Sequence, residues 1–459
     1  MSKTNTIDFT KGRPSRNIIK MFLPLYIAYF CTVLYDIIGS LWVGTLLGEK
    51  ALAAQSASVP AVMLFSALVM GATNGVTILL SRYLGAKNHA KVRSTITTSL
   101  ISLFLFGLIL MAACLIGING ILTSGNVPIQ IFGIAKTYLF FRILSFPFIE
   151  LYMYFAAVLR SYGNTSMQMI TVIISTILNI ALDPILILHI GINGAAIATL
   201  ISQIVTMLIM IIYILKMQII SFNLMTFNFE SLKEIAWTSV PSAIQQSIPT
   251  ISMAFIQSLF SSFGIVSLAA YSVASKLEII VLYPGLTINM SETTAVGTCY
   301  GAKKNLKIKE YLKYGIMCSG GLVLILTPLI TIFSNNLSGL FGVSYSAAII
   351  VKKYLEIIAI GYLLNCVINS IMGEMNGLQQ QTRSMLLMAL YCIVIRIPIA
   401  KLLSSSTMGV DGIAAAILIS YIAAVVVAII YQYSVLNKTV LKVSLLARDT
   451  EVQIVNQNS

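Results

Sequence analysis

Long apolar stretches alternate with short polar segments along almost the whole chain. An apolar stretch of about 20 residues or more has the length of an α-helix that crosses a bilayer, whereas barrel strands are half as long and alternate in polarity. The pattern predicts an all-α polytopic membrane protein with twelve transmembrane helices, at residues 18–47, 51–82, 92–118, 130–159, 167–189, 193–216, 232–263, 266–300, 310–334, 346–378, 384–403 and 411–436. Several of these ranges are longer than a bilayer requires, so we expect tilted helices.

Composition supports a membrane protein. Hydrophobic residues make up 58% of the 459 residues and charged residues only 10%, with a mean hydropathy of +0.92, whereas a soluble domain has about 25% charged residues. The net charge of +14 would suggest a nucleic-acid partner in a soluble protein. Here the basic residues lie in short loops, where their distribution indicates the orientation of the chain in the membrane. We therefore expect the lipid bilayer, and no nucleic acid, as a partner.

The distribution of lysine and arginine predicts the orientation of the chain. With the N-terminus inside, 21 of the 29 basic residues lie in segments assigned to the cytoplasm. Only five lie in outer segments, namely Lys50, Lys136, Lys352, Lys353 and Lys401. Because cytoplasmic loops are enriched in these residues, we expect a multi-pass protein of the cell's inner membrane with both termini in the cytoplasm.

The sequence contains none of the residue patterns that catalysis or metal binding usually requires. Its six cysteines are scattered, and its two histidines, His89 and His189, lack metal-ligand spacing. It has no HExxH motif and no glycine-flanked nucleophile. We expect no enzyme activity, no cofactor, and no metal site other than Na⁺ at an ion-coupling site.

An internal repeat relates the two halves of the chain. Eight residues between positions 48 and 87 recur 216 residues later, and residues 191–202 match 409–420 at an offset of 218. Gly163 also matches Gly377, at an offset of 214. Each half then has six spans and inserts with the same orientation, an arrangement seen in transporters whose substrate sites lie between the repeats.

The repeat predicts the division of the chain into lobes. We expect a cytoplasmic N-terminal tail at 1–17, an N-lobe at 18–216, a cytoplasmic linker at 217–231, a C-lobe at 232–437 and a cytoplasmic C-terminal tail at 438–459.

Four polar residues occur only in the first half. They are Asp36, Asn179, Asp183 and Thr199, and the last three correspond to isoleucines in the second half. The fold does not require these groups, because the second half omits them, and intramembrane carboxylates are costly and usually functional. We therefore predict a coupling site for a proton or a monovalent cation. The alternative is a buried aspartate at position 183 that only satisfies neighbouring backbone groups.

Charged residues in other spans have less specific interpretations. Lys276 and Glu278 are two residues apart and do not face each other along a helix, so they either line a substrate cavity or reach water near a helix end. Arg396 is interpreted as a structural ion-pair partner. Arg142 and Glu150 are interpreted as a pair across a kink at the intervening proline.

Four motifs resemble the multidrug and toxic compound extrusion (MATE) family, in particular its DinF/MepA-like bacterial branch. They are LLSRYLGAK (79–87), LRSYGN (159–164), LNIALDPILI (178–187) and GINGAAIATLIS (191–202). The resemblance covers essentially all twelve spans. It implies two six-helix lobes around a V-shaped cavity, and it assigns Asp36, Asn179, Asp183 and Thr199 to the cation or proton site of the N-lobe.

One departure from the family concerns the second half. The NorM-like branch has acids for sodium coupling in spans seven and ten, where this chain has Gln246 and Asn365. The resemblance therefore leaves the N-lobe as the better candidate for coupling. The expected substrate-cavity residues are Gln246, Lys276, Glu278, Glu292 and Asn365, of which Glu292 matches an acid of the MepA-like branch.

We expect a secondary active multidrug efflux transporter that exchanges organic cations for H⁺ or Na⁺ by alternating access and acts as a monomer. By the resemblance, its substrates include dyes, quaternary ammonium compounds and fluoroquinolones. The rival function is a lipid-linked oligosaccharide flippase of the same superfamily, which would favour several cationic residues in the cavity. An intramembrane enzyme is the alternative from another class.

Overall fold

The computed structural model describes residues 6–125, 127–219, 227–341 and 343–436, and within these ranges every regular element is helical. The predicted C-terminal tail (438–459) and much of the predicted linker lie outside the described residues. The elements are α1 (Pro14–Leu47), α2 (Glu49–Gly85), α3 (His89–Ile116), α4 (Ile118–Ser124), α5 (Ile129–Leu144), α6 (Phe146–Ser161), α7 (Ser166–Ile190), α8 (Ile192–Lys216), α9 (Phe229–Ser262), α10 (Ile265–Gly301), α11 (Asn305–Ile332), α12 (Ser334–Leu340), α13 (Tyr345–Gly377), α14 (Gln381–Ala389), the π-helical turn η2 (Leu390–Ile395), α15 (Arg396–Ser404), α16 (Val410–Tyr431) and the π-helical turn η3 (Gln432–Leu436).

Eleven candidate membrane spans are found in the described part of the chain, counting α5 with α6 and α14 with η2 and α15. This confirms the expectation of an all-α polytopic membrane protein. The predicted count of twelve depends on α9, which has 34 residues but is more polar than the others.

Two predicted spans are interrupted for identifiable reasons. The predicted span at 130–159 is broken at Ser145, directly before α6, which has proline in its first turn. Proline is tolerated there because its missing N–H would have had no helical partner. The predicted span at 384–403 is interrupted by η2, which ends directly before Arg396.

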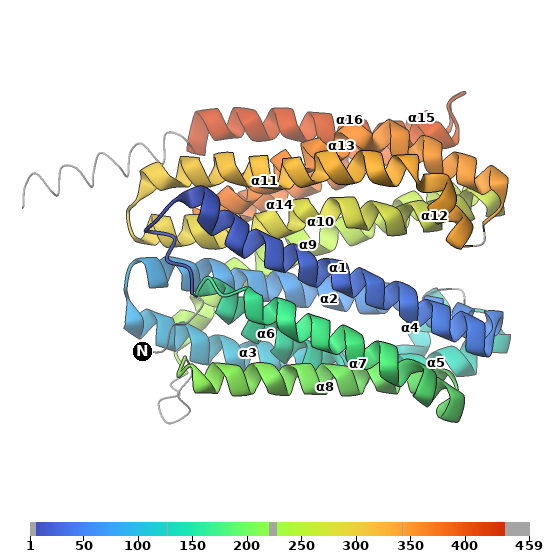
Figure 1. Cartoon of the computed structure of the whole chain (residues 1–459), viewed down its shortest axis with the longest axis horizontal. Helices are drawn as coiled ribbons and strands as arrows, with labels where there is room; N and C mark the ends of the chain where they lie inside the picture. Colours follow the sequence, from blue (N-terminus) through green and yellow to red (C-terminus); the bar gives the residue numbers. More distant parts are fainter. Residues whose placement is uncertain (1–5, 126, 220–226, 342, 437–459) are drawn as a thin grey trace, which may run out of the picture. The chain divides into compact units, whose positions relative to one another are not determined.

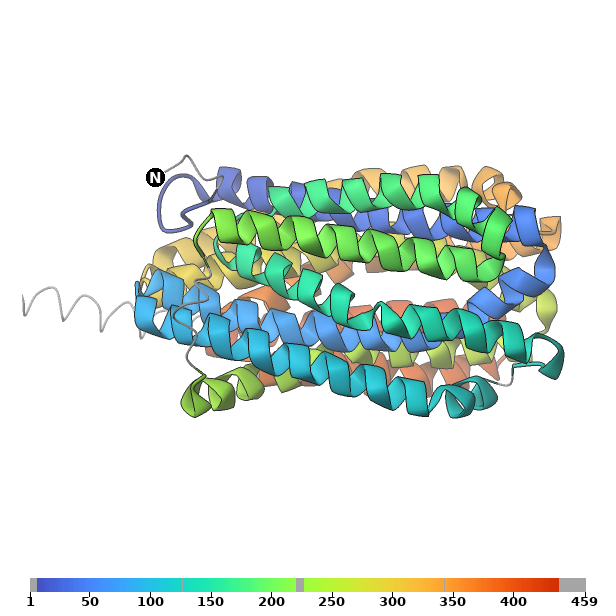
Figure 2. The same ribbon diagram turned by 90° about the horizontal axis from the view of Figure 1, so that it is seen from below.

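The chain forms two compact units. Unit 1 contains residues 1–7, 23–80 and 88–243, and unit 2 contains residues 8–22, 81–87 and 244–459. In unit 1, α7 and α8 run side by side, as Figures 1 and 2 both show. In unit 2, α10 and α13 form the most extensive helix pair.

The internal repeat is visible in the backbone. Residues with positive φ recur at matching turns, as in Gly48 and Gly264, Lys87 and Lys303, and Gly191 and Gly409. These pairs have the offsets that the sequence predicts. At the turn after α6, however, Gly163 (φ 73°) corresponds to Gln379 (φ 66°) rather than to Gly377. The offset there is therefore 216, and the predicted match at 214 is wrong.

A pair of hydrogen bonds supports the corrected offset. Thr77 Oγ1 donates to the carbonyl oxygen of Ala157 at 3.4 Å, and Thr293 Oγ1 donates to that of Gly373 at 3.5 Å. Donor and acceptor are each shifted by 216 residues between these two bonds. The same helix contact is thus built twice, once in each unit.

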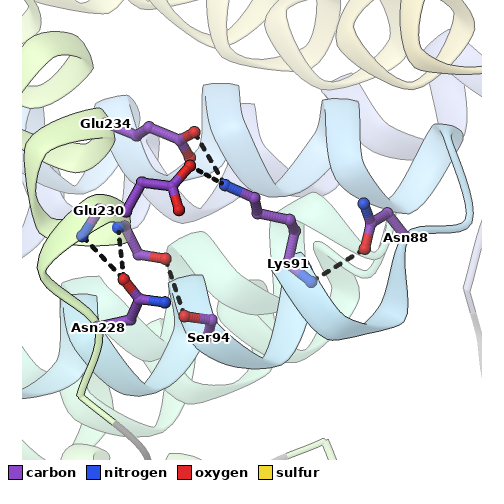
Figure 3. Close-up of polar contacts among 7 residues, drawn as sticks. Asn88, Lys91, Ser94, Asn228, Glu230 and Glu234 are labelled. Carbon is purple, nitrogen blue, oxygen red and sulfur yellow. Dashed lines mark hydrogen bonds and ion pairs between the residues drawn. The ribbon is translucent and has the colours of Figure 1, made fainter.

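In unit 1 the first half of α9 is held against α2 and α3. A Cβ atom at Gly71 or Gly75 of α2 would lie 2.3 or 2.4 Å from the Cα atoms of Ala243 and Ser239, so these two glycines allow α9 to pack closely. Figure 3 shows the attachment to α3, where Lys91 points toward two acids of α9.

In unit 2 the segment before α1 is docked on α11. The ring of Phe9 is buried against that of Tyr311, whose hydroxyl donates to the Phe9 carbonyl oxygen at 2.9 Å. Lys304 and Lys307 donate to the carbonyl oxygens of Thr10 and Gly12, each at 3.1 Å. Because these bonds satisfy the carbonyl groups of Phe9, Thr10 and Gly12, the segment is held without being part of a helix.

Candidate functional site

The hairpin of α7 and α8 positions three of the four predicted coupling residues. Gly191 is the single residue between the two helices, and its φ of 66° is a conformation that glycine adopts at little cost. Asp183 lies eight residues before Gly191 and Thr199 lies eight residues after it. The hairpin therefore brings Asp183 and Thr199 to the same depth. Asn179 precedes Asp183 by four residues and lies one turn further from Gly191.

Helix α1 brings Asp36 to this hairpin. A Cβ atom at Gly39 of α1 would lie 3.4 Å from Oδ2 of Asp183, so the two helices touch there. Asp36 precedes Gly39 by three residues and shares its helix face. Asp36 itself is exposed, and both Asp36 and Asp183 interact electrostatically with Tyr35. The two aspartates therefore lie in the same region of unit 1, and their role in coupling stays a prediction.

A short hydrogen bond joins α1 to α8. The hydroxyl groups of Tyr35 and Thr199 lie 2.6 Å apart. Thr199 Oγ1 also donates to the carbonyl oxygen of Ala195 at 3.0 Å. Since a hydroxyl has one proton to donate, Tyr35 is the donor in the bond between the two side chains.

Two acceptor oxygens in this cluster lack protein donors. Asn179 and Asp183 are 1% and 3% exposed, and neither Asn179 Oδ1 nor Asp183 Oδ1 has a hydrogen-bond partner. Asn179 Nδ2 is used locally, donating to the Ser175 carbonyl oxygen at 3.3 Å. Buried acceptors are nearly always satisfied, so these two oxygens are suited to a proton or a hard cation.

Arg142 also belongs to this cluster. It lies in the last turn of α5 and interacts electrostatically with Tyr35, Asp36 and Asp183. The cluster therefore contains two carboxyl groups and one permanent positive charge.

The predicted cavity residues of the second half lie at several places in unit 2. Glu278 is buried and accepts a hydrogen bond from the Tyr354 hydroxyl at 3.0 Å. Lys276 is exposed, and its ammonium lies 5.3 Å from the centre of the Phe341 ring. The two side chains point in different directions, as their spacing predicts.

The remaining predicted cavity residues are buried. Gln246 is 8% exposed and Glu292 is completely buried. Asn365 accepts hydrogen bonds from Asn369 Nδ2 at its carbonyl and side-chain oxygens, both at 3.0 Å.

Arg396 makes no close ion pair within the described part of the chain, although it interacts electrostatically with the buried Glu278. Its guanidinium lies 5.6 Å from the ring centre of Tyr391 and 4.9 Å from that of Tyr421, and Nε donates to Ser420 at 3.1 Å. No carboxylate among the described residues is within ion-pair distance. The nearest partners of the guanidinium are therefore the tyrosine rings, which stabilise its charge by cation–π contacts.

Comparison with known proteins identifies the family. The MatE family model matches residues 24–185 and 241–402, one match in each half and together more than half of the chain. The chain belongs to the MATE family. Its predicted resemblance is thereby confirmed.

Named relatives of this MATE protein are described as drug exporters. It is 28% identical over 371 residues to the probable multidrug resistance protein YoeA of Bacillus subtilis, covering 77% of this chain and 80% of YoeA. It is 25% identical over 423 residues to the multidrug export protein MepA of Staphylococcus aureus (strain MRSA252), covering 90% and 92%.

The fold agrees with solved structures of the family. A MATE family multidrug resistance transporter in an outward-facing conformation has a TM-score of 0.88 and 23% identity, with 98% of this chain and all of that one covered. The expected two-repeat MATE fold is confirmed.

The expected pair of Arg142 and Glu150 is wrong. Arg142 faces the coupling cluster, whereas Glu150 lies on α6 with Oε2 packed on Gly107 of α3, and neither Glu150 oxygen has a hydrogen-bond partner. The break at Ser145 places the two residues on different helices, so their sequence spacing does not determine their relative direction.

Sequence reasoning did not place Tyr35 and Arg142 in this polar cluster of unit 1. The signal for Arg142 was available, because a basic residue within a span requires a nearby acid or a polar cavity. Tyr35 had no such signal, since a tyrosine beside an apolar run is common in any membrane helix.

Proposed function

We propose that this MATE protein is a secondary active multidrug efflux transporter that exchanges organic cations for H⁺ or Na⁺ by alternating access. The observation that carries the proposal is the cluster at α1, α7 and α8, where Asp36 and Asp183 both act on Tyr35 and where Asn179 Oδ1 and Asp183 Oδ1 have no hydrogen-bond donor among the described residues. Membership of the MATE family and the drug-export names of YoeA and MepA support the substrate class.

The charges of the cluster suggest the stoichiometry of coupling. Arg142 offsets one of the two aspartate charges, which leaves one net negative charge for a single proton or Na⁺. Asn179 Oδ1 and Asp183 Oδ1 would accept that ion, because both are hard oxygen ligands. Tyr35 and Thr199 would hold α1 against α8 around it. No prosthetic cofactor enters this proposal.

Coupling requires the ion to bind more tightly in one transport state than in the other. Three helices contribute to the cluster, so a change in the position of α1 relative to the α7–α8 hairpin would change the site. Ion binding would therefore bias the equilibrium between the two states. The coupled substrate would be an organic cation that leaves the cell.

The remaining expectations complete the proposal. The charge bias supports an inner-membrane protein with both termini in the cytoplasm. The repeat supports an N-lobe at 18–216 and a C-lobe at 232–437, joined by the linker at 217–231. We propose that the transporter works as a monomer.

Dye efflux from proteoliposomes under an imposed H⁺ or Na⁺ gradient tests this function. Asp36→Asn and Asp183→Asn should abolish gradient-driven efflux, while Asp411→Asn should leave it unchanged, because Asp411 is an ion-pair partner of Lys353 outside the cluster. Efflux that persists in both cluster variants would overturn the coupling role. The gradient that drives efflux in the wild type identifies the ion.

The same liposomes distinguish the flippase alternative. A flippase would scramble a fluorescent lipid-linked sugar and would not transport the dye. The structure reduces the support for this alternative, because Arg396, one of its two cationic candidates, is enclosed by tyrosines.

A further inference from the structure

A second group of buried acids lies in unit 2, at the contact of α10 with α11 and α13. Glycines allow these helices to approach closely. A Cβ atom at Gly373 of α13 would lie 2.7 Å from the Asn289 carbonyl oxygen, and one at Gly377 would lie 2.6 Å from Cβ of Val296. The region is therefore tightly packed, and a charged group within it is shielded from water.

Glu292 is enclosed at this contact. It is completely buried, and its Oε1 lies 1.6 Å from the position that a Cβ atom at Gly315 of α11 would occupy. Its own Cβ lies 3.0 Å from the corresponding position at Gly373. Neither carboxyl oxygen has a hydrogen-bond partner of good geometry. The carboxyl group is thus held between Gly315 and Gly373.

Glu374 follows Gly373 directly and is the second acid. It is 1% exposed, and both of its oxygens also lack hydrogen-bond partners. It interacts electrostatically with Glu292. Ser370, one turn earlier on α13, is fully buried and faces Glu292, and its hydroxyl is otherwise unpartnered.

The other titratable groups around the pair both lie on α11. Lys309 faces Glu374 and Cys318 faces Glu292. From η3, the uncharged side chain of Gln432 faces Glu374. Lys309 makes no ion pair with either acid within the described part of the chain, and a single lysine does not neutralise two buried carboxylates.

The repeat shows that the fold does not require these acids. At the offset of 216, Glu292 corresponds to Val76 and Glu374 to Val158. Both valines are completely buried at the equivalent contact of α2 and α6, next to the hydrogen bond from Thr77 to the Ala157 carbonyl oxygen. Unit 1 therefore builds the same contact with apolar side chains.

We propose that Glu292 and Glu374 form a proton-binding pair in the second half of the transporter. A proton is favoured over a metal ion because the packing of Glu292 on Gly315 excludes a shell of several oxygen ligands. Neighbouring carboxyl groups of this kind titrate as a coupled pair.

The depth of the two acids suggests a route for the proton. Glu374 lies three residues before the end of α13 and Glu292 lies nine residues before the end of α10, or about 5 and 14 Å from those ends at 1.5 Å per residue. Lys309 lies in the second turn of α11, at the same end. Glu374 would exchange protons with the adjacent loops and pass them to Glu292. The use of this route in efflux rests on the proposed function, whereas proton binding does not.

Infrared spectroscopy of the full-length protein in liposomes tests proton binding directly. The wild type should show the carbonyl band of a protonated, weakly hydrogen-bonded carboxyl group at neutral pH, and the band should disappear in steps as the pH is raised. Glu292→Gln or Glu374→Gln should each reduce the two-step titration to a single step. Glu356→Gln is the matched control, because Glu356 lies on the same helix but is half exposed and pairs with Lys352.

The proposal is overturned if the band is unchanged in both glutamine variants, or if Na⁺ at constant pH removes it. A double variant, Glu292→Val with Glu374→Val, reproduces the pair found in unit 1, and it should fold and lack the band. Dye efflux separates the two proposals. If the double variant loses the band but keeps efflux, the pair binds a proton but has no role in coupling. Loss of efflux in Asp183→Asn concerns only the proposed function.

Discussion

Gly85 of α2 and Thr298 of α10 touch backbone to backbone, since a Cβ atom at Gly85 would lie 2.1 Å from the Thr298 carbonyl oxygen. The reciprocal contact is also present, because a Cβ atom at Gly301 would lie 2.0 Å from the Arg82 carbonyl oxygen. The residues are related by the offset of 216, so Gly85 corresponds to Gly301 and Arg82 to Thr298. Within unit 2, the ends of α2 and α10 therefore meet in a self-complementary contact that requires glycine on both sides.

Gly85→Ala and Gly301→Ala should each destabilise the protein by about 1–3 kcal/mol, because the added methyl group forces the backbones apart. Thermal unfolding in nanodiscs measures the effect. Gly133→Ala is the matched control, since a Cβ atom there would meet nothing within 4 Å, and alanine should stabilise that helix by up to about 1 kcal/mol. Equal effects at Gly85 and Gly133 would contradict this interpretation of the contact.

Breaking the hydrogen bond between Tyr35 and Thr199 should weaken ion coupling. A net loss of about 0.5–1.5 kcal/mol corresponds to a roughly two- to tenfold higher ion concentration for half-maximal efflux. Tyr35→Phe and Thr199→Val should show this shift, measured as dye efflux against ion concentration. Thr199→Ser keeps the hydroxyl and should resemble the wild type. A shift of the same size in Thr199→Ser would show that the methyl group matters instead of the bond.

The attachment of α9 to α3 in Figure 3 should depend on salt. Lys91 Nζ lies 3.1 Å from Oε1 of both Glu230 and Glu234. Partly exposed pairs of this kind contribute about 0.2–1 kcal/mol each and are screened by salt. Lys91→Gln should therefore increase amide hydrogen exchange at the start of α9 at low salt and have less effect at high salt.

A double-mutant comparison isolates this attachment. The Glu230→Gln and Glu234→Gln double variant should match Lys91→Gln, and adding Lys91→Gln to it should change little, because the pairs are already broken. Lys352→Gln, which breaks an exposed pair within α13, should leave exchange in α9 unchanged. Additive effects of the three substitutions would contradict the shared role of Lys91.

Docking of the segment before α1 should weaken in acid. Partial burial of Asp8 raises its pKa, but hydrogen bonds from the side chain and backbone of Thr10, together with the charges of Lys11 and Lys304, outweigh this effect and hold the pKa below its ordinary value of 3.8. The ionised Asp8 side chain stabilises the docked form, and this contribution is fully present above pH 3.8. It is lost as the pH falls through the lower pKa that Asp8 has in the docked form.

A spin label reports this change. Attached at Arg13→Cys in a cysteine-free background, it should be immobile at neutral pH and become mobile as the pH falls below 3.8, the ordinary pKa of the carboxyl group. With Asp8→Asn added, its mobility should no longer change with pH over this range, because the neutral side chain does not titrate. A pH-dependent signal that survives in Asp8→Asn would assign the transition to another group.

The sequence alone determined the class of this protein and its two repeats, and it named the four residues that we propose for ion coupling. These features could be predicted because apolar run length, charge bias and recurring residues are properties of the chain that do not depend on how helices pack. Asp183 and Thr199 also lie on a hairpin with a one-residue turn, so counting residues from Gly191 suffices to place them at one depth. Asp36 could be added because the second half lacks its equivalent.

Only the tertiary structure decided which polar groups meet. The direction of a side chain depends on the rotation and crossing of its helix, and a break such as Ser145 resets that rotation. Arg142 therefore faces the coupling cluster instead of Glu150, and Arg396 lies between two tyrosines. The match of Gly163 to Gly377 was wrong because an apolar sequence can be aligned with itself at two offsets that differ by two residues. The positive φ angles of Gly163 and Gln379 fix the correct offset. At the corrected offset, Glu292 and Glu374 correspond to two buried valines. The fold therefore does not require acids at these two positions.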